Sequence, residues 1–86
     1  MSSLTLHAEP LAQSVRLTDA ELVVMLSDGR VLSIPLVWFP RLLKASPEAR
    51  EHFELLGNGA GIHWPDVDED ISVAGLLAGN TSFEYR

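Results

Sequence analysis

The densest group of chemistry-bearing side chains is an acidic run at residues 66–70, Asp-Val-Asp-Glu-Asp. Acidic residues at alternate positions match the opening of a calcium-binding loop, in which carboxylates supply oxygen ligands. Such a loop also needs glycine at its sixth position and a bidentate glutamate at its twelfth. Ile71 and Leu77 stand there instead, so no metal site is predicted. The carboxylates are expected to favour the start of a following helix, with Asp68 or Asp70 as its cap.

Other residue types that support catalysis or phosphate binding occur in the wrong arrangement. The glycine-rich stretch 57–61 follows a predicted helix, whereas a phosphate-binding loop follows a strand and opens a helix. The histidines, His7, His52 and His63, lack metal-ligand spacing. The chain has no cysteine, which excludes disulfides and thiolate metal sites. The sequence therefore predicts no catalytic residue, no cofactor and no metal, and hence no enzyme.

Aromatic residues beside prolines form the second group of candidate functional residues. Trp38 and Phe39 precede Pro40, and Trp64 precedes Pro65. Exposed aromatics with a nearby arginine are typical of binding hot spots, and Arg41 could stack on an indole. In so small a chain, at least one tryptophan is expected in the core. The candidate partner-binding residues are Trp38, Phe39, Arg41, Asp66, Asp68 and Glu69.

The composition indicates one acidic globular domain. The chain has 86 residues and a net charge of −6, from twelve acidic and six basic residues. The basic residues are scattered, which disfavours direct nucleic-acid binding, and no apolar run approaches the length of a membrane span. We expect a cytoplasmic location, and the acidic balance would suit a basic protein partner. A single domain is predicted over residues 1–86, with an ordered core at about 12–79, an arm at 1–10 and a tail at 80–86.

These candidate residues must be positioned by a mixture of strands and short helices. Alternation predicts a strand after Ala12, and Asp28-Gly29 predicts a two-residue turn between strands at 22–27 and 30–34. Ser46-Pro47 predicts the capped start of a helix. The further elements expected are a short helix at 41–45, the capped helix at 47–56, a strand at 62–64, a last helix around 73–77 and an optional strand at 83–85.

The fold class predicted is α+β, a small antiparallel sheet with two or three short helices packed on one face. The sheet would combine the N-terminal strand, the hairpin and the later short strand. The residues expected to be largely buried are Leu22, Val24, Ile34, Phe53, Trp64, Leu76 and Leu77.

Several motifs together resemble a known bacterial family. They are Asp-Gly-Arg at 28–30 with Pro35, Trp-Phe-Pro-Arg-Leu at 38–42, His-Trp-Pro at 63–65, and the segment 68–77. The set is similar to the domain of unknown function DUF2442, over about residues 14–79. The resemblance implies a small α+β fold and no established activity, cofactor or catalytic residue. Members are often encoded beside another small domain, which implies an antitoxin-like role.

Two classes of function follow from these observations. The leading hypothesis is a protein-interaction module that binds a small basic partner, in an antitoxin-like manner, through its acidic surface and aromatic junctions. The alternative is a small-molecule-sensing or regulatory domain with a pocket near the two tryptophans. A pocket of roughly 300 Å³ or more would favour the sensor, and an exposed sheet edge would favour the interaction module. A homo-oligomer stays open.

Overall fold

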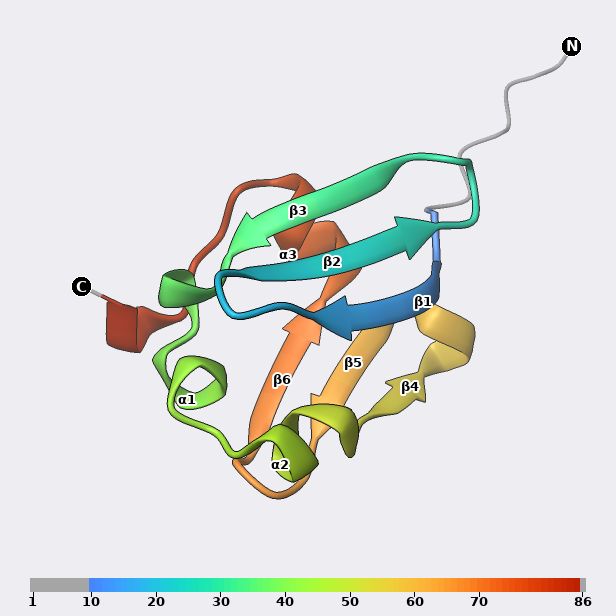
Figure 1. Cartoon of the computed structure of the whole chain (residues 1–86). Helices are drawn as coiled ribbons and strands as arrows, with labels where there is room; N and C mark the ends of the chain where they lie inside the picture. Colours follow the sequence, from blue (N-terminus) through green and yellow to red (C-terminus); the bar gives the residue numbers. More distant parts are fainter. Residues whose placement is uncertain (1–9, 86) are drawn as a thin grey trace, which may run out of the picture.

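The chain folds into two small antiparallel sheets joined by short helices (Figure 1). The computed structural model describes residues 10–85, so the expected N-terminal arm lies almost wholly outside the described residues. The strands are β1 (Ala12–Leu17), β2 (Glu21–Leu26), β3 (Val31–Pro35), β4 (Glu54–Leu56), β5 (Gly61–Trp64) and β6 (Glu69–Ser72). The helices are η2 (Leu36–Trp38), α1 (Pro40–Leu43), α2 (Pro47–Glu51), η3 (Gly57–Gly59), α3 (Val73–Leu77) and η4 (Phe83–Tyr85). The α+β class is confirmed, and no helix of the described part is long and apolar enough to cross a membrane.

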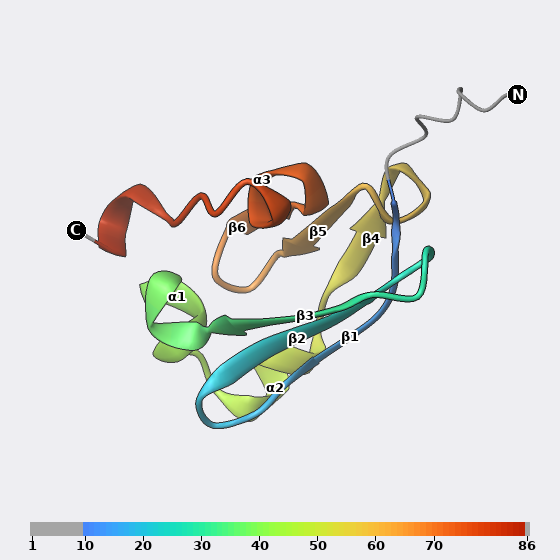
Figure 2. The ribbon, with the colours of Figure 1, turned by 90° about the horizontal axis from the view of Figure 1, so that it is seen from above.

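The strands fall into two sheets of three, with the orders β1-β2-β3 and β4-β5-β6. The later strand at 62–64, expected to join the first sheet, is β5 and forms the centre of the second sheet. The two sheets lie one over the other (Figure 2), and the core fills the space between them. Its largest fully buried side chains are Trp64, Leu22, Leu26, Leu36, Leu42, Ile62, Val24 and Val73.

The predicted hairpin is present, but its turn is of a different kind. The N–H of Leu26 donates to the carbonyl of Arg30 (2.8 Å), and the N–H of Gly29 donates to the carbonyl of Leu26 (3.1 Å). Only Gly29, at φ 96°, has a positive φ in this loop. Four residues, 27–30, therefore lie between the two strands, and the expected two-residue turn, which needs positive φ at both positions, is wrong. The Asp28 carboxylate instead accepts from the N–H of Arg30 (3.0 Å).

The helix predicted at 47–56 is half as long as expected. Its start is right, because the Ser46 hydroxyl accepts from the N–H of Ala49 (3.1 Å). It ends at Glu51, and the chain then pairs with β5 as strand β4. The apolar spacing that suggested one helical face is therefore misleading: Phe53 is half-buried between the two elements, and Leu56 is exposed.

The acidic run also belongs to a hairpin rather than to a helix start. Trp64 pairs with Glu69 across the turn between β5 and β6, and Asp68 takes a positive φ of 54° there. The cap of α3 is Ser72, whose hydroxyl accepts from the N–H of Gly75 (2.9 Å), so neither expected aspartate caps it. The optional last strand is the 3-10 turn η4 instead.

The predicted core is right in part. Leu22, Val24, Trp64 and Leu76 are buried. Ile34 and Phe53 are only partly buried, and Leu77 is exposed on α3, because that helix turns only its Val73 and Leu76 side inward.

Gly59 brings the loop after β4 against the start of β1. It has φ +109°, and a Cβ on it would stand 2.5 Å from the carbonyl oxygen of Ala12. Glycine alone allows this approach, since it accepts positive φ and carries no side chain. The contact links the second sheet to the edge strand of the first.

Candidate functional site

The aromatic candidates are distributed between core and surface. Phe39 and Trp64 are buried, so neither can serve as the exposed anchor that the sequence suggested for Phe39. The Trp64 indole N–H donates to the carbonyl of Arg50 (3.0 Å), and its ring lies 6.0 Å from that of Phe53. Trp38 is half-buried, with its ring 6.4 Å from the exposed ring of Tyr85. Trp38 therefore remains the aromatic candidate at the surface.

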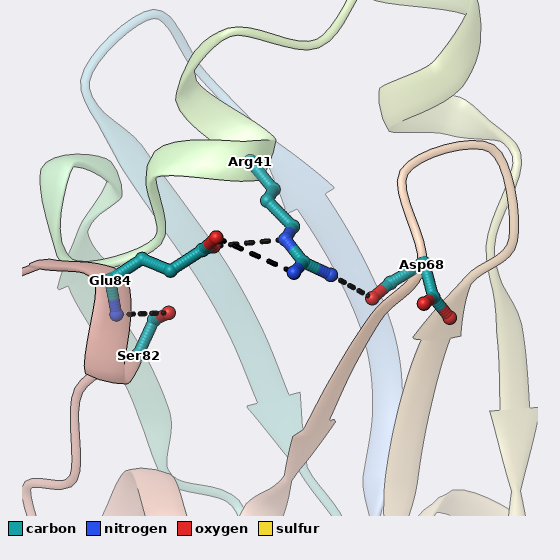
Figure 3. Close-up of polar contacts among 4 residues, drawn as sticks. All are labelled: Arg41, Asp68, Ser82 and Glu84. Atoms are coloured by element: carbon teal, nitrogen blue, oxygen red, sulfur yellow. Dashed lines mark hydrogen bonds and ion pairs between the residues drawn. The ribbon is translucent and has the colours of Figure 1, made fainter.

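Arg41 connects three segments within the molecule (Figure 3). Its Nε donates to Oε1 of Glu84 (2.9 Å), and its Nη1 donates to the carbonyl of Asp68 (2.7 Å). Nη2 completes the contact with Oε2 of Glu84 at 3.4 Å. The hydrogen bond to Glu84 raises the pKa of Arg41. The guanidinium thus joins α1, the β5–β6 turn and the C-terminal segment. Its donors are used in these hydrogen bonds, and it does not stack on an indole as the sequence suggested.

The acidic run does not form one flat face. Asp66 meets His52 (Oδ1 to Nδ1, 3.0 Å), and Asp70 meets His63 on the neighbouring strand (2.5 Å). Asp68 is exposed, but Glu69 between them is only 9% exposed. Glu69 is therefore removed from the partner-contact surface proposed from sequence, because residues alternate between the two faces of β6. In the described part of the chain, no group of three or more acidic or histidine side chains is arranged to hold a metal.

Glu69 faces a small polar pocket, here called the Glu69 pocket, of about 160 Å³. Burial raises the pKa of the Glu69 carboxyl; the positive charge of Arg41 opposes this, and the negative charges of Glu84, Asp70 and Asp68 add to it. Within residues 10–85 no buried side-chain oxygen or nitrogen lacks a hydrogen-bond partner, so the carboxylate oxygens of Glu69, to which no protein group donates, reach solvent. The pocket is lined by Phe39, Glu69, Asp70, Ile71, Ser72, Gly75, Leu76, Asn80, Thr81 and Ser82.

A larger groove of about 440 Å³, here called the β1–α2 groove, runs between strand β1 and helix α2. Its apolar lining comes from Val15, Leu17, Pro47 and Phe53, and its polar lining from Arg16, Thr18, Asp19, Arg50 and Glu51. The guanidinium of Arg50 is held in place, because it donates to the carbonyls of Leu42 (3.0 Å) and Leu43 (2.7 Å).

Sequence reasoning missed this groove. The alternation of Val15, Arg16 and Leu17 marks a half-buried strand, but it does not reveal that the strand lies at a sheet edge. The pocket that the sequence suggested near the two tryptophans is not where the groove lies. Neither Trp38 nor Trp64 lines the groove, although the ring of Trp64 packs near Phe53, which does line it.

Comparisons with known proteins identify relatives without an assigned role. A family model described as protein of unknown function, DUF2442, matches residues 12–82, as the motif resemblance predicted. A crystal structure of a protein of unknown function from Rhodospirillum rubrum is 33% identical, with a TM-score of 0.75 over 90% of this chain and 95% of that one. A solution structure of an uncharacterized protein from Chromobacterium violaceum is 26% identical, with a TM-score of 0.69 over 84% of this chain and 68% of that one. No curated protein matches the chain.

Proposed function

Starting from the fact that the chain belongs to the DUF2442 family, we propose that it is a protein-interaction module. It binds an extended segment of a partner protein in the β1–α2 groove. One observation carries the proposal: a groove of about 440 Å³, lined by both apolar and charged side chains, lies along an edge strand of the first sheet. An antitoxin-like role is one use of such a module, since masking a segment of a partner can silence it.

The unpaired edge of β1, beyond the contact of Ala12 with the Gly59 loop, supports this mode of binding. β1 pairs with β2 on one side, and within residues 10–85 no strand pairs with its other side. An edge strand presents backbone N–H and C=O groups that can pair with another chain. Peptide-binding domains use such edges to add a strand, and neighbouring pockets then select alternate side chains of the peptide.

The side chains along β1 indicate which partner segment fits. Val15 and Leu17 pair across the sheet with Val24 and Leu22, which are fully buried. Val15 and Leu17 are themselves only partly buried, so apolar area remains for a partner to cover. The groove rim carries both signs of charge, from Arg16 and Arg50 and from Asp19 and Glu51. The favoured partner segment is therefore extended, with apolar side chains at alternate positions, and need not be strongly basic.

A small-molecule site is the second candidate for the same groove. Its volume lies within the usual range of ligand pockets, roughly 300–1,000 Å³. A peptide is nevertheless favoured over a small molecule, because one wall of the groove is a strand edge. Such an edge can pair with the backbone of a peptide, but it does not enclose a small ligand.

A selection experiment tests the proposal without a known partner. Decapeptides are selected from a random phage-displayed library against the wild-type chain, and their affinities are measured by fluorescence anisotropy. We expect Leu17→Lys, in the groove, to weaken binding at least about tenfold, the equivalent of about 1.4 kcal/mol. The control Val31→Lys changes an exposed residue on β3, at the opposite edge of the sheet, and should leave affinity unchanged.

The outcomes separate the two candidates. Peptides that bind wild-type and Leu17→Lys chains equally, both with native melting curves, would place the binding surface elsewhere. If no peptide is enriched while small heterocyclic compounds saturate the groove, the small-molecule function replaces the proposed one.

A further inference from the structure

Ser82 and the turn η4 that follows it, here called the η4 segment, lie against Trp38 and Arg41, here called the Arg41–Trp38 surface. The Glu84 carboxylate accepts from Nε and Nη2 of Arg41 at 2.9 and 3.4 Å (Figure 3). The N–H of Ser82 donates to the carbonyl of Trp38 (3.1 Å), and the ring of Tyr85 lies 6.4 Å from the Trp38 ring. The surface therefore accepts a carboxylate and an aromatic ring from one short turn.

The contacts of the η4 segment are of a kind that another molecule can replace. The ion pair is partly exposed, with the side chains of Arg41 and Glu84 38% and 35% accessible, and such pairs add little to stability. The ring of Tyr85 is exposed, so it gains little from burial. The N–H groups of Glu84 and Tyr85 both bond to Ser82, within the segment itself. A peptide that makes the same outward contacts can therefore take the place of the segment.

Arg41 is held in position for a carboxylate independently of the η4 segment. Its Nη1 donates to the backbone carbonyl of Asp68 (2.7 Å), in the turn between β5 and β6. The next residue, Leu42, is fully buried, which anchors the backbone of α1 that carries Arg41. A guanidinium fixed in this way offers a two-point contact to a carboxylate, and little conformational freedom is lost when the contact forms.

From this arrangement we infer that the Arg41–Trp38 surface is a docking site for a partner peptide in which a carboxylate residue is followed directly by an aromatic residue. The η4 segment occupies the site within the same chain and defines the chemistry of the partner, because it presents Glu84 and then Tyr85. The inference is independent of the proposed function, since neither Trp38 nor Arg41 lines the β1–α2 groove.

The charges around the site define the partner further. The carboxylates of Asp68 and Glu69 act on the charge of Arg41, and the whole chain carries a net charge of −6. These charges repel a peptide with many acidic residues. One carboxylate in direct contact with the guanidinium still gains charge-assisted hydrogen bonds. A segment with one carboxylate and otherwise neutral side chains therefore fits the site best.

The test uses a full-length variant in which the η4 segment no longer competes. Glu84→Ala/Tyr85→Ala removes both side chains from the site. The peptide acetyl-Ser-Phe-Glu-Tyr-amide, which repeats residues 82–85, is then titrated into the ¹⁵N-labelled chain. We expect saturable shifts of the Trp38 amide and of the Arg41 Nε–H signal. The wild-type chain should bind at least about tenfold more weakly, because its own segment competes at a high effective concentration.

Matched controls place the effect on the two contacts. Glu54→Ala removes the same charge from an exposed residue of β4 and should bind the peptide like the wild type. Glutamine in place of the peptide's glutamate should weaken binding to the double variant at least about tenfold, and so should Arg41→Gln added to that variant. Alanine in place of the peptide's tyrosine should weaken it at least about threefold.

Four outcomes would overturn the inference: no binding, equal binding by the wild type and the double variant, equal binding of the glutamine peptide, or shifts at Val15 and Leu17 instead of Trp38. The last outcome would place the peptide in the β1–α2 groove and so support the proposed function alone. A wild-type dimer that the double variant loses, seen by sedimentation, would replace the partner by a second copy of the chain. The comparison of peptides can be repeated on the wild-type chain at millimolar peptide, so it stands even if a variant fails to fold.

Discussion

Replacement of Gly59 by alanine probes the contact that joins the two sheets. The added Cβ would lie 2.5 Å from the carbonyl oxygen of Ala12 and 3.0 Å from its nitrogen. Ordinary contacts begin near 3.4 Å, so the loop after β4 and the start of β1 must separate by roughly 0.9 Å. Both partners are backbone atoms, which cannot turn away as a flexible side chain could.

The expected loss of stability has two parts. A side chain in the left-handed region costs about 1–2 kcal/mol, and forcing extra volume into a packed contact costs about 1–3 kcal/mol. Gly59→Ala should therefore lower the free energy of unfolding by roughly 2–5 kcal/mol. That is a large share of the ~5–15 kcal/mol typical of a whole domain.

A second glycine separates the two parts. Gly79 has φ +81°, and a Cβ there would meet nothing within 4 Å. Gly79→Ala should therefore cost only the backbone part, about 1–2 kcal/mol. Both variants can be measured by urea unfolding, followed by tryptophan fluorescence. Equal losses in the two variants would refute the steric contact between β1 and the loop after β4.

Three further substitutions test other parts of the structure. Trp64→Phe removes the donor to the Arg50 carbonyl and should cost about 1–3 kcal/mol, measured by urea unfolding; an unchanged midpoint would contradict the buried hydrogen bond. Phe53→Ala, at a half-buried residue, should cost roughly 2 kcal/mol, about half the range for a full burial, and should also weaken peptide binding in the groove. Burial raises the Glu69 pKa, so the wild-type chain should lose stability as pH rises from about 4 through that raised pKa. Glu69→Gln should therefore melt above the wild type at pH 7 and equal to it near pH 3; a constant difference across this range would contradict the assigned burial.

Local sequence signals predicted those parts of the fold that depend on neighbouring residues. Ser46-Pro47 marks a helix start because a hydroxyl cap and a preset φ act within one turn. The apolar run of β2 and the Asp-Gly pair indicate a hairpin for a similarly local reason. Trp64 could be expected inside because a small chain has few large side chains with which to fill a core.

Features that depend on strand pairing could not be predicted in this way. β4 and β6 have three and four residues, too few for alternation to identify them. The spacing of Phe53 and Leu56 also fits one face of a helix. Only the pairing of β4 with β5 shows that this segment is a strand. The burial of Glu69 follows from its register opposite Trp64, and the β1–α2 groove follows from the strand order. No local sequence motif indicates the burial of Glu69 or the presence of the groove.

Backbone methylation of a selected peptide tests most directly whether the groove adds a strand to β1. Methyl groups on alternate backbone nitrogens remove the donors from one edge of an extended peptide and leave the protein unchanged. Two lost hydrogen bonds at about 1 kcal/mol each correspond to roughly thirtyfold weaker affinity. Methylation in one register should therefore abolish most of the binding, and methylation shifted by one residue should preserve it. Equal affinities for the two methylated peptides would contradict strand addition at β1.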